Sequence, residues 1–361
     1  MSVTPASQGW HMPAEWEPHE ATWIAWPHCR DDWPGKFAAI PWVYGEIVKH
    51  LHTGEFVHIL VNDGTHEKRS RAVLKKVGVD LQQIHFFHIR TDRAWTRDSG
   101  PIFMTNRAGN VALTDWRFNA WAKYNNWKND DQVPSRINQH LRLQCWQPKC
   151  KGKRIVLEGG SIDVNGAGLL LTTEECLLSP IQARNPKLSR SDIEGVLGDY
   201  LGVKKVHWLK CGIAGDDTHG HIDDLSRFVG PHTVVTVLEK NRADPNYESL
   251  QENFAQLAQI DIAGKPLDIV TLPMPAPLFF CGRRLPASYA NFYIANERVL
   301  VPTFNDPHDR VALGILADMF PKRTVVGIHA VDLVWGLGTL HCMTQQQPKM
   351  RGEGSGARGQ G

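Results

Sequence analysis

The sequence lacks several features that would place it in a specialised class of protein. None of its seven cysteines forms a CxxC pair, and their number is odd and their spacing irregular. These absences exclude a disulfide framework and argue against a structural zinc motif or a thiol-exchange motif. We therefore expect most of the cysteines to be small buried side chains.

The chain also has no long hydrophobic run and no excess of one charge. The first 20 residues contain no apolar core of signal-peptide length, and no segment approaches the roughly 20 apolar residues that a membrane span needs. The 40 basic side chains are balanced by 38 acidic ones. We therefore expect a cytoplasmic protein that binds neither nucleic acid nor a membrane and whose partner is a small molecule. Whether the chain forms a homo-oligomer is left open.

What is present is enough material for a large core. The chain has 361 residues, 42% of them hydrophobic, with 13 Trp and 13 Phe. No linker rich in Pro, Gly or Ser divides it, so we predict a single catalytic domain over residues 1–350. Residues 351–361 are Gly-rich and almost without apolar side chains, and we predict a disordered tail there.

Short apolar or alternating runs recur along the whole chain and indicate strands. They cover Ala21–Pro27, Phe56–Val61, Pro101–Thr105, Leu169–Thr172, Thr233–Leu238 and Asn291–Pro302. Segments with one apolar side lie between them and indicate helices. These cover Trp42–His52, Ser70–Val77, Ser191–Leu201, Asn246–Ile260 and Asp309–Phe320. The predicted fold class is mixed α/β.

Four polar clusters are spaced at related intervals. Asp98, Glu158 and His221 are 60 and 63 residues apart, and Cys342 follows Asp223 by 119 residues, about twice that interval. Units of about 65 to 70 residues, each giving one loop to a shared centre, would form a closed ring of roughly five blades. Coincidence is the alternative, because the sequence identity between the units is negligible.

Cys342 is the strongest candidate for a catalytic residue. It follows Gly336-Leu-Gly-Thr-Leu-His341, where glycines let a substrate approach the backbone closely. A lone cysteine is more often a buried filler. Here, however, it precedes Met343-Thr-Gln-Gln-Gln-Pro348, a run of amides and hydroxyl that a core would not accept without hydrogen-bond partners. We therefore predict that Cys342 is a nucleophile.

Two other clusters supply carboxylates. In Trp95-Thr-Arg-Asp-Ser-Gly-Pro101, Asp98 would bind a cationic ligand and Trp95 would stack on it. The same segment could also be an ordinary turn before a strand. Glu158 follows residues 154–157, an apolar segment that we predict to be a strand. A carboxylate at the end of a buried strand is usually paired or functional.

The densest polar cluster is Asp216-Asp-Thr-His-Gly-His-Ile-Asp-Asp224. If this segment is extended, alternate residues share a face, so His221 would act as a general acid and base and Asp223 would bind positive charge. His219 would lie on the same face, so a metal site of His219, His221 and Asp223 is the competing interpretation. The later histidines form no second dense cluster, and we therefore favour acid/base chemistry.

Taken together, these segments resemble the agmatine deiminase family. The resemblance runs from about residue 12 to residue 348 in the family's order. It is carried by Met12-Pro-Ala-Glu-Trp-Glu-Pro-His-Glu20, Trp95-Thr-Arg-Asp-Ser-Gly-Pro101, Phe118-Asn-Ala-Trp121, Glu158-Gly-Gly-Ser161, Gly220-His-Ile-Asp223 and His341-Cys-Met-Thr-Gln-Gln-Gln-Pro348. The resemblance implies the fold of guanidine-modifying enzymes, a pseudo-symmetric five-bladed α/β propeller also called a pentein.

The resemblance also implies a role for each cluster. Cys342 would be the nucleophile, His221 the acid and base, and Glu158 a partner of the histidine or the substrate. Asp98 and Asp223 would hold a guanidinium ion, a small cationic substrate, in the plane needed for attack. Agmatine would become N-carbamoylputrescine and ammonia through a covalent thiouronium intermediate, which needs no metal and no organic cofactor.

The substrate's distal end is less well defined by the sequence. Many relatives have Gly-Gly-Asn-Ile where this chain has Leu337-Gly-Thr-Leu340, so the loop beside the thiol differs. Agmatine's amine would need an acidic partner, for which Asp217 and Glu20 are candidates. If Arg283 or Arg284 reached that end instead, arginine or a C-terminal peptidyl-arginine would fit better.

Two alternatives belong to other classes of protein. The first is a metal-dependent hydrolase that uses the histidine cluster. The second is a non-catalytic relative, like the ribosome anti-association factor that shares the propeller shape. Such a relative would be expected to lack the thiol, the histidine and the carboxylates together, and this chain has all of them.

Overall fold

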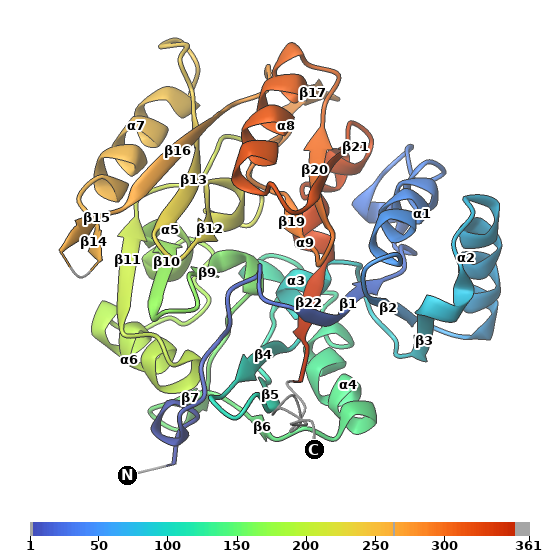
Figure 1. Ribbon diagram of the computed structural model, residues 1–361, viewed down its shortest axis with the longest axis horizontal. Coiled ribbons are helices and arrows are strands. Elements are labelled where there is room, and N and C mark those ends of the chain that lie inside the picture. The colour runs from blue at the N-terminus through green and yellow to red at the C-terminus, as the bar shows by residue number, and fades with distance from the viewer. Residues whose placement is uncertain (1–2, 263, 351–361) are drawn as a thin grey trace, which may run out of the picture.

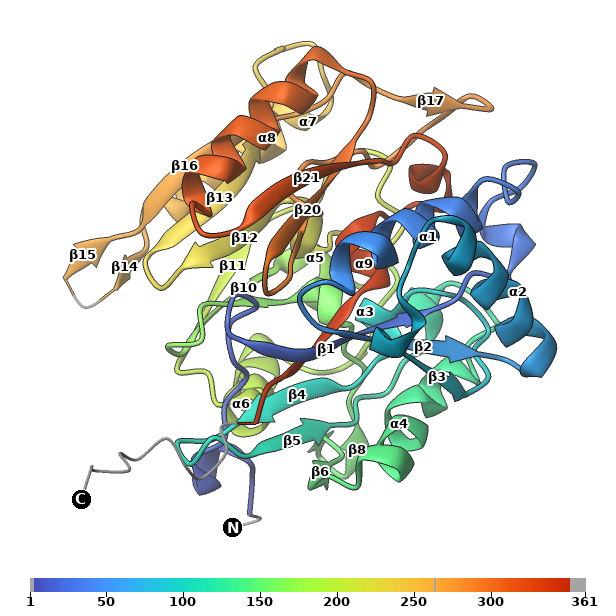
Figure 2. The ribbon, with the colours of Figure 1, turned by 45° about the vertical axis from the view of Figure 1, so that its right-hand side comes forward.

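One arrangement of strands and helix recurs through the computed structural model, which describes residues 3–262 and 264–350 (Figures 1 and 2). Two strands pair antiparallel, a helix follows the second strand, and a third strand pairs parallel with that second strand. Among the described residues, five sheets contain this arrangement.

One of these sheets is built from both ends of the described chain. β22 pairs antiparallel with β1, and β2 pairs parallel with β1 on its other side. In Figure 1 the red strand β22 accordingly lies beside the blue strand β1. Its elements are β1 (His19–Ala25), α1 (Ile40–Leu51), β2 (Phe56–Val61), α2 (Gly64–Lys76), β3 (Ile84–His88) and β22 (Gln345–Pro348).

The other four sheets follow along the chain between these two ends. Their elements are β4 (Ile102–Thr105), β5 (Val111–Thr114), α4 (Val133–Leu141) and β6 (Cys145–Trp146); β9 (Asp163–Val164), β10 (Leu169–Thr173), α6 (Arg190–Leu201) and β11 (Lys205–Leu209); β12 (Ser226–Gly230), β13 (Thr233–Leu238), α7 (Asn246–Leu257) and β16 (Asp268–Pro273); and β19 (Tyr293–Ile294), β20 (Arg298–Thr303), α8 (Pro307–Met319) and β21 (Thr324–His329).

Shorter elements connect these units. Three small hairpins are β7 (Lys149–Cys150) with β8 (Lys153–Arg154), β14 (Asp261–Ile262) with β15 (Lys265–Pro266), and β17 (Phe279–Phe280) with β18 (Arg283–Arg284). Three short helices are α3 (Thr96–Ser99), α5 (Glu174–Leu178) and α9 (Leu340–Met343). All three of these short helices carry residues of the candidate site.

Buried apolar side chains fill the space between sheets and helices. The central strands β10 and β13 are buried over all or most of their length, as expected for strands with neighbours on both sides. The largest buried rings include Trp23, Trp33 and Tyr44. This apolar burial is the main favourable term in folding, and it holds the short site elements in place.

Local sequence signals set the ends of the helices. Asp306 caps α8 by accepting a hydrogen bond from a backbone N–H of the first turn, and Pro307 occupies the first position. α6 ends at Gly202, whose φ of 67° suits glycine. α2 begins at Gly64 because the side chain of Asp63 caps it. The helix predicted over 70–77 therefore starts six residues earlier than expected.

Most of the predicted elements are confirmed, and so is the α/β class. The strands over 56–61 and 233–238 have the predicted bounds. The helices predicted over 42–52, 191–201, 246–260 and 309–320 have ends within three residues of those positions. The run over 291–302 forms two strands, β19 and β20, with the expected turn after Ala295.

Two predicted strands were wrong. Within 154–157, Arg154 ends the short strand β8 and Val156 forms a single bridge to Arg117, and the chain then turns into a 3₁₀ helix at Gly159–Ser161. Residues 216–224 are a bend followed by a 3₁₀ turn at Ile222–Asp224, because His219 has a φ of 66° and Gly220 a φ of 91°, which no extended strand accommodates.

Two further expectations concern the tail and the membrane. The predicted tail, residues 351–361, lies outside the described residues. Within residues 3–262 and 264–350, no helix is long and apolar enough to cross a bilayer.

Candidate active site

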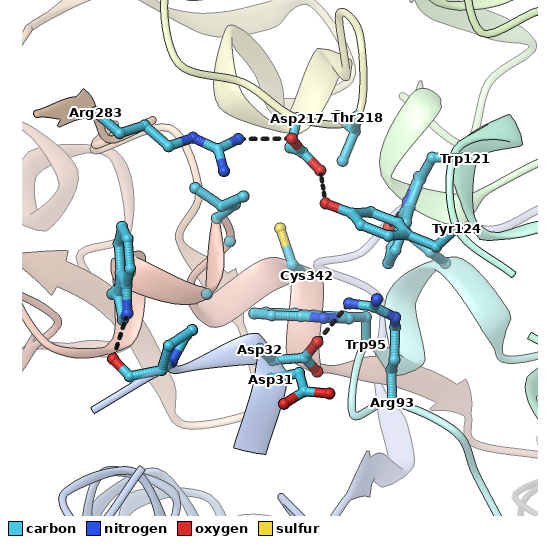
Figure 3. Close-up of a pocket in the computed structure, with 16 residues that line it drawn as sticks. Asp31, Asp32, Arg93, Trp95, Trp121, Tyr124, Asp217, Thr218, Arg283 and Cys342 are labelled. Atoms are coloured by element: carbon cyan, nitrogen blue, oxygen red, sulfur yellow. Dashed lines mark hydrogen bonds and ion pairs between the residues drawn. The ribbon is translucent and has the colours of Figure 1, made fainter. Parts of the chain in front are cut away.

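A pocket of about 380 Å³ contains the predicted nucleophile among its lining residues (Figure 3). Its lining has an inner and an outer part. The inner part includes Cys342, Asp98 and Trp95, each at most 5% exposed. The outer part, which we call the mouth, comprises Asp31, Arg93, Tyr124, Asp217 and Arg283. We call Cys342, His221, Asp98, Asp223 and Glu158 the inner cluster.

Cys342 lies on α9, a single helical turn between the loop of Gly336 to Gly338 and β22. The amide nitrogen of Asn291 donates a hydrogen bond of 3.1 Å to its sulfur, and the Oδ2 atom of Asp223 is 3.7 Å from that sulfur. A Cβ atom at Gly338 would lie 3.2 Å from the sulfur. Glycine at this position therefore keeps the space beside the thiol open.

His221 lies among three carboxylates. Its Nδ1 atom is 3.8 Å from an oxygen of Asp98 and 3.9 Å from an oxygen of Asp223, and its Nε2 atom is 4.0 Å from an oxygen of Glu158. The residue is buried, yet neither ring nitrogen has a hydrogen-bond partner among the described residues. Because buried polar groups are normally paired, these two nitrogens point to a place where a ligand binds.

Asp98 is held from two sides. The indole Nε1 of Trp121 donates to its Oδ2 (2.9 Å), and the backbone N–H of Gly160 donates to its Oδ1 (3.0 Å). A Cβ atom at Gly160 would lie 2.6 Å from Nδ1 of His221 and 2.8 Å from Oδ1 of Asp98. Only glycine lets the backbone approach both groups this closely, which explains the glycine pair after Glu158.

Asp223 is fixed through the residue next to the nucleophile. Nδ1 of His341 is 2.7 Å from Oδ2 of Asp223, and Nε2 of His341 is 2.8 Å from Glu15. Glu15 in turn pairs with Arg227 at 2.8 Å. The other oxygen of Asp223 has no hydrogen-bond partner among the described residues. This buried chain of charges therefore holds the turn that carries Cys342 while leaving one carboxylate oxygen available.

Glu158 is fully buried and paired on one side. Its Oε1 accepts a hydrogen bond of 3.0 Å from Nε of Arg184, whereas its Oε2 has no partner among the described residues. Cys176, on α5, is a further neighbour: one ligand atom each from Glu158, Cys176 and His221 lie within 4.8 Å of one another. These atom types can bind zinc, so this set, rather than the predicted one, is the group with metal-binding geometry.

Burial and charge shift the acidity of the inner cluster. Burial, followed by the charges of nearby carboxylates including Asp223, raises the pKa of the Cys342 thiol well above its ordinary value. Burial opposes charge on His221, but Asp98, Cys176 and Asp223 outweigh it and raise the pKa of the imidazole well above its ordinary value. Burial also raises the pKa of Asp98 to about 6. The free site therefore favours a thiol and an imidazolium at neutral pH.

The mouth is built from longer and more exposed side chains. Asp217 accepts hydrogen bonds from the ammonium group of Lys123 (2.5 Å), from the guanidinium group of Arg283 (2.6 Å) and from the Tyr124 hydroxyl. Figure 3 shows Arg283 and Tyr124 meeting at Asp217 above the sulfur of Cys342. The predicted binding residue Asp217 therefore lies at the pocket, although its carboxylate is already paired.

The five residues predicted to be catalytic lie together in the inner cluster. Three residues that were considered as alternatives, for a metal site or for the distal end of the substrate, lie elsewhere. His219 turns away from His221 and lies 3.1 Å from the hydroxyl of Ser179, so the predicted metal site of His219, His221 and Asp223 does not form. Glu20 does not line the pocket. Arg284 pairs with Asp244 outside the pocket lining, so of the two arginines only Arg283 reaches the mouth.

Several residues of the site were not predicted from the sequence. They are Asn291, which contacts the sulfur; His341 and Glu15, which hold Asp223; and Arg184 and Cys176, which contact the acid/base side. His341 and Glu15 lie inside segments that carried the family resemblance. The sequence therefore marked these segments as part of the family pattern but did not indicate what the two side chains do. Nothing local to Asn291 or Cys176 distinguishes them from ordinary buried residues.

Comparisons with known proteins agree with this geometry. Residues 11–348 match the family model described as Porphyromonas-type peptidyl-arginine deiminase. A relative named agmatine deiminase, from Ectopseudomonas mendocina (strain ymp), is 37% identical over 98% of this chain and 99% of its own. One from Pseudomonas aeruginosa (strain LESB58) is 37% identical over 96% of this chain and 98% of its own. The solved structure of agmatine deiminase of Enterococcus faecalis has a TM-score of 0.88 at 33% identity, covering 97% of this chain and 99% of the other.

Proposed function

The chain belongs to the Porphyromonas-type peptidyl-arginine deiminase family, and we propose that it hydrolyses the guanidinium group of agmatine to give N-carbamoylputrescine and ammonia. The relatives that match over nearly their whole length carry the name agmatine deiminase. The chain is accordingly a hydrolase that acts on guanidino groups.

One observation carries the proposal. In the inner cluster, two buried carboxylate oxygens lack hydrogen-bond partners among the described residues, Oδ1 of Asp223 and Oε2 of Glu158, and so do both ring nitrogens of His221. Leaving such atoms unpaired costs free energy, and a ligand with several N–H donors would recover it at the two carboxylate oxygens. A guanidinium ion has five N–H donors in one plane when it carries one alkyl group, and it stays charged because its pKa exceeds about 12.

The proposed reaction begins with attack by sulfur. Asp98 and Asp223 hold the guanidinium plane, and the Cys342 thiolate adds to its central carbon. His221, as imidazolium, protonates the departing nitrogen, and ammonia leaves a thiouronium intermediate. Neutral His221 then takes a proton from water, which attacks the same carbon. The carbon–sulfur bond breaks, leaving a ureido group and the free thiol.

The substrate itself is the best source of charge for the thiolate. Burial and the surrounding carboxylates raise the pKa of Cys342 in the free site, so the neutral thiol is favoured there. A bound guanidinium places a full positive charge beside the sulfur and opposes that shift. The hydrogen bond from Asn291 to the sulfur acts in the same direction. We therefore expect the thiol to lose its proton, to solvent, only when substrate is bound.

Further parts of the proposal concern the whole molecule. The five sheets that share one arrangement of strands and helix, with β22 pairing to β1, support a five-bladed α/β propeller formed by residues 1–350 as one catalytic domain. The balanced charge of the chain supports an enzyme that binds no nucleic acid or membrane, and its proposed location is the cytoplasm. Its product would enter putrescine and polyamine biosynthesis.

A substrate panel tests the function. The purified enzyme is incubated with agmatine, arginine and a C-terminal peptidyl-arginine, and ureido product and ammonia are measured, with Cys342→Ala as the blank. We expect agmatine to be converted fastest and the blank to be inactive. Arginine or the peptide as the fastest substrate would show that Arg283, which lines the mouth, accepts a carboxylate. Turnover by Cys342→Ala would reject the mechanism.

A chelator separates the metal-dependent alternative. A metallohydrolase would lose activity in EDTA, regain it with added metal, and tolerate Cys342→Ser. We expect the reverse on each count. Release of no ammonia from any guanidine would instead support the non-catalytic alternative.

A further inference from the structure

The hairpin that carries Arg283 has no further strand beside it among the described residues. Its strands β17 and β18 pair with each other, around a turn at Cys281 and Gly282 with φ of 49° and 74°. Positive φ at both central residues is typical of a tight hairpin turn. The hairpin is held by packing as well: the ring of Phe280, the cross-strand partner of Arg283, packs edge-on against Trp335 with the ring centroids 4.6 Å apart. The part of this hairpin that can move most easily is therefore the exposed side chain of Arg283.

The two arginines of β18 point to different partners. Arg284 pairs with Asp244 at 2.9 Å, and its side chain is 14% exposed. Arg283 pairs with Asp217 at 2.6 Å, and its side chain is 45% exposed. Neighbouring residues of a strand face opposite sides, so the base of the hairpin is held by Arg284 while Arg283 extends over the mouth (Figure 3).

The pair at the mouth occupies the carboxylate that a cationic substrate needs. Asp217 is largely buried and already accepts hydrogen bonds from Lys123, Tyr124 and Arg283. Of the two cations bonded to it, Arg283 lines the pocket and Lys123 does not. A ligand entering the pocket therefore meets the Arg283 side of this carboxylate.

We propose that Arg283 is a specificity-determining residue that competes with the distal ammonium group of the substrate for Asp217. This inference rests on the proposed function. When an ω-guanidino alkylamine binds, its ammonium replaces the Arg283 guanidinium on Asp217, and the Arg283 side chain turns toward solvent. A guanidine with an uncharged distal end leaves the pair intact. Arg283 thus lowers the affinity of the pocket for other cations. Tight binding then depends on an ammonium group at the right distance from the guanidinium.

The competition can be measured with two substrates and two variants. Agmatine carries the distal ammonium, and n-butylguanidine is nearly the same molecule without it. For Arg283→Ala we expect the KM for agmatine to fall about two- to fivefold, as loss of a partly exposed ion pair predicts, with kcat unchanged. The KM for n-butylguanidine stays the same. Arg284→Ala removes an equal charge from the same strand and leaves both KM values unchanged.

The contrary results are equally specific. A KM for agmatine that is unchanged or higher in Arg283→Ala overturns the inference. So does an equal fall for both substrates or in both variants, which would reflect a general gain in negative charge.

A binding measurement separates this inference from the proposed reaction. Agmatine is titrated calorimetrically into Cys342→Ala and into Cys342→Ala combined with Arg283→Ala. Tighter binding by the double variant supports the competition even if the wild-type enzyme converts no agmatine. Equal or weaker binding by the double variant overturns the inference even if the wild-type enzyme converts agmatine.

Discussion

The inner cluster and the mouth use the same kinds of charged group in different ways. In the inner cluster, Asp98 and Asp223 are buried, lie on short turns, and are held by the backbone of Gly160 and by His341. At the mouth, Arg283 is a long side chain on a two-stranded hairpin and is 45% exposed. Both regions pair cations with carboxylates, but among the described residues Asp223 and Glu158 each leave one buried oxygen without a partner, whereas both oxygens of Asp217 are bonded.

This difference separates chemistry from selection. Electrostatic stabilisation of a transition state depends on charges that do not move during the reaction, which buried and over-determined groups provide. Selection among substrates depends on whether a group of the substrate can replace a protein group in an existing ion pair. Paired side chains that are partly exposed allow such an exchange. A change to the inner cluster should therefore lower kcat strongly, whereas a change to the mouth should alter KM slightly.

The largest effect is expected from Asp98→Asn. The amide keeps the shape of the side chain but removes the charge that holds the guanidinium and supports the imidazolium of His221. We expect kcat/KM for agmatine to fall by about a thousandfold or more, with the fold preserved. Ammonia release together with circular dichroism checks both parts. A folded variant with near-normal turnover would end the distinction between the two regions.

A second test uses a glycine of the inner cluster. In Gly160→Ala the new Cβ atom would lie 2.6 Å from Nδ1 of His221, so the ring or the backbone must shift. Misplacement by about 1 Å at a reacting group costs about a hundredfold in rate, and we expect a loss of that order in kcat. Gly195→Ala is the matched control, because its Cβ would meet nothing within 4 Å. Equal activities of the two variants would show that the inner cluster is less rigid than we infer.

The pH dependence offers a third test. The pKa of Asp98 is raised to about 6, and its ionised form is the one that binds the guanidinium. We expect kcat/KM to fall as pH drops through about 6, because Asp98 takes up a proton there. Trp121→Phe removes a hydrogen bond that stabilises the carboxylate, so this acid limb should move to higher pH. Trp335→Phe, which alters another pocket tryptophan, should leave the limb in place.

The sequence predicted the residues of the inner cluster better than their local structure. Cys342 and Asp98 were recognised from glycines and polar neighbours that an ordinary core does not contain. The segment of His221 and Asp223 was expected to be a strand, and it is a bend followed by a 3₁₀ turn. The error came from treating alternating polar residues as a sign of extended backbone, whereas positive φ at His219 and Gly220 breaks the alternation.

The partners of the cluster could not be predicted for a different reason. Asn291 contacts Cys342, which lies 51 residues away in the sequence. Glu15 contacts His341, which lies 326 residues away. Only the folded arrangement brings such positions together, and neither residue type indicates which distant atom it will contact. The same holds at the mouth. The sequence suggested Arg283 as a partner for the carboxylate of a substrate, but it did not suggest the ion pair of Arg283 with Asp217.

The smallest effect is expected from Asp217→Asn. This substitution removes the charge for which Arg283 and the substrate ammonium compete, while the inner cluster is unchanged. We expect the KM for agmatine to rise about two- to fivefold with kcat unchanged, because a single partly exposed ion pair is worth at most about 1 kcal/mol. The KM for n-butylguanidine should not change. Steady-state kinetics with both substrates decide the matter, because a fall in kcat would mean that Asp217 acts on the reacting carbon and that the mouth belongs to the chemistry after all.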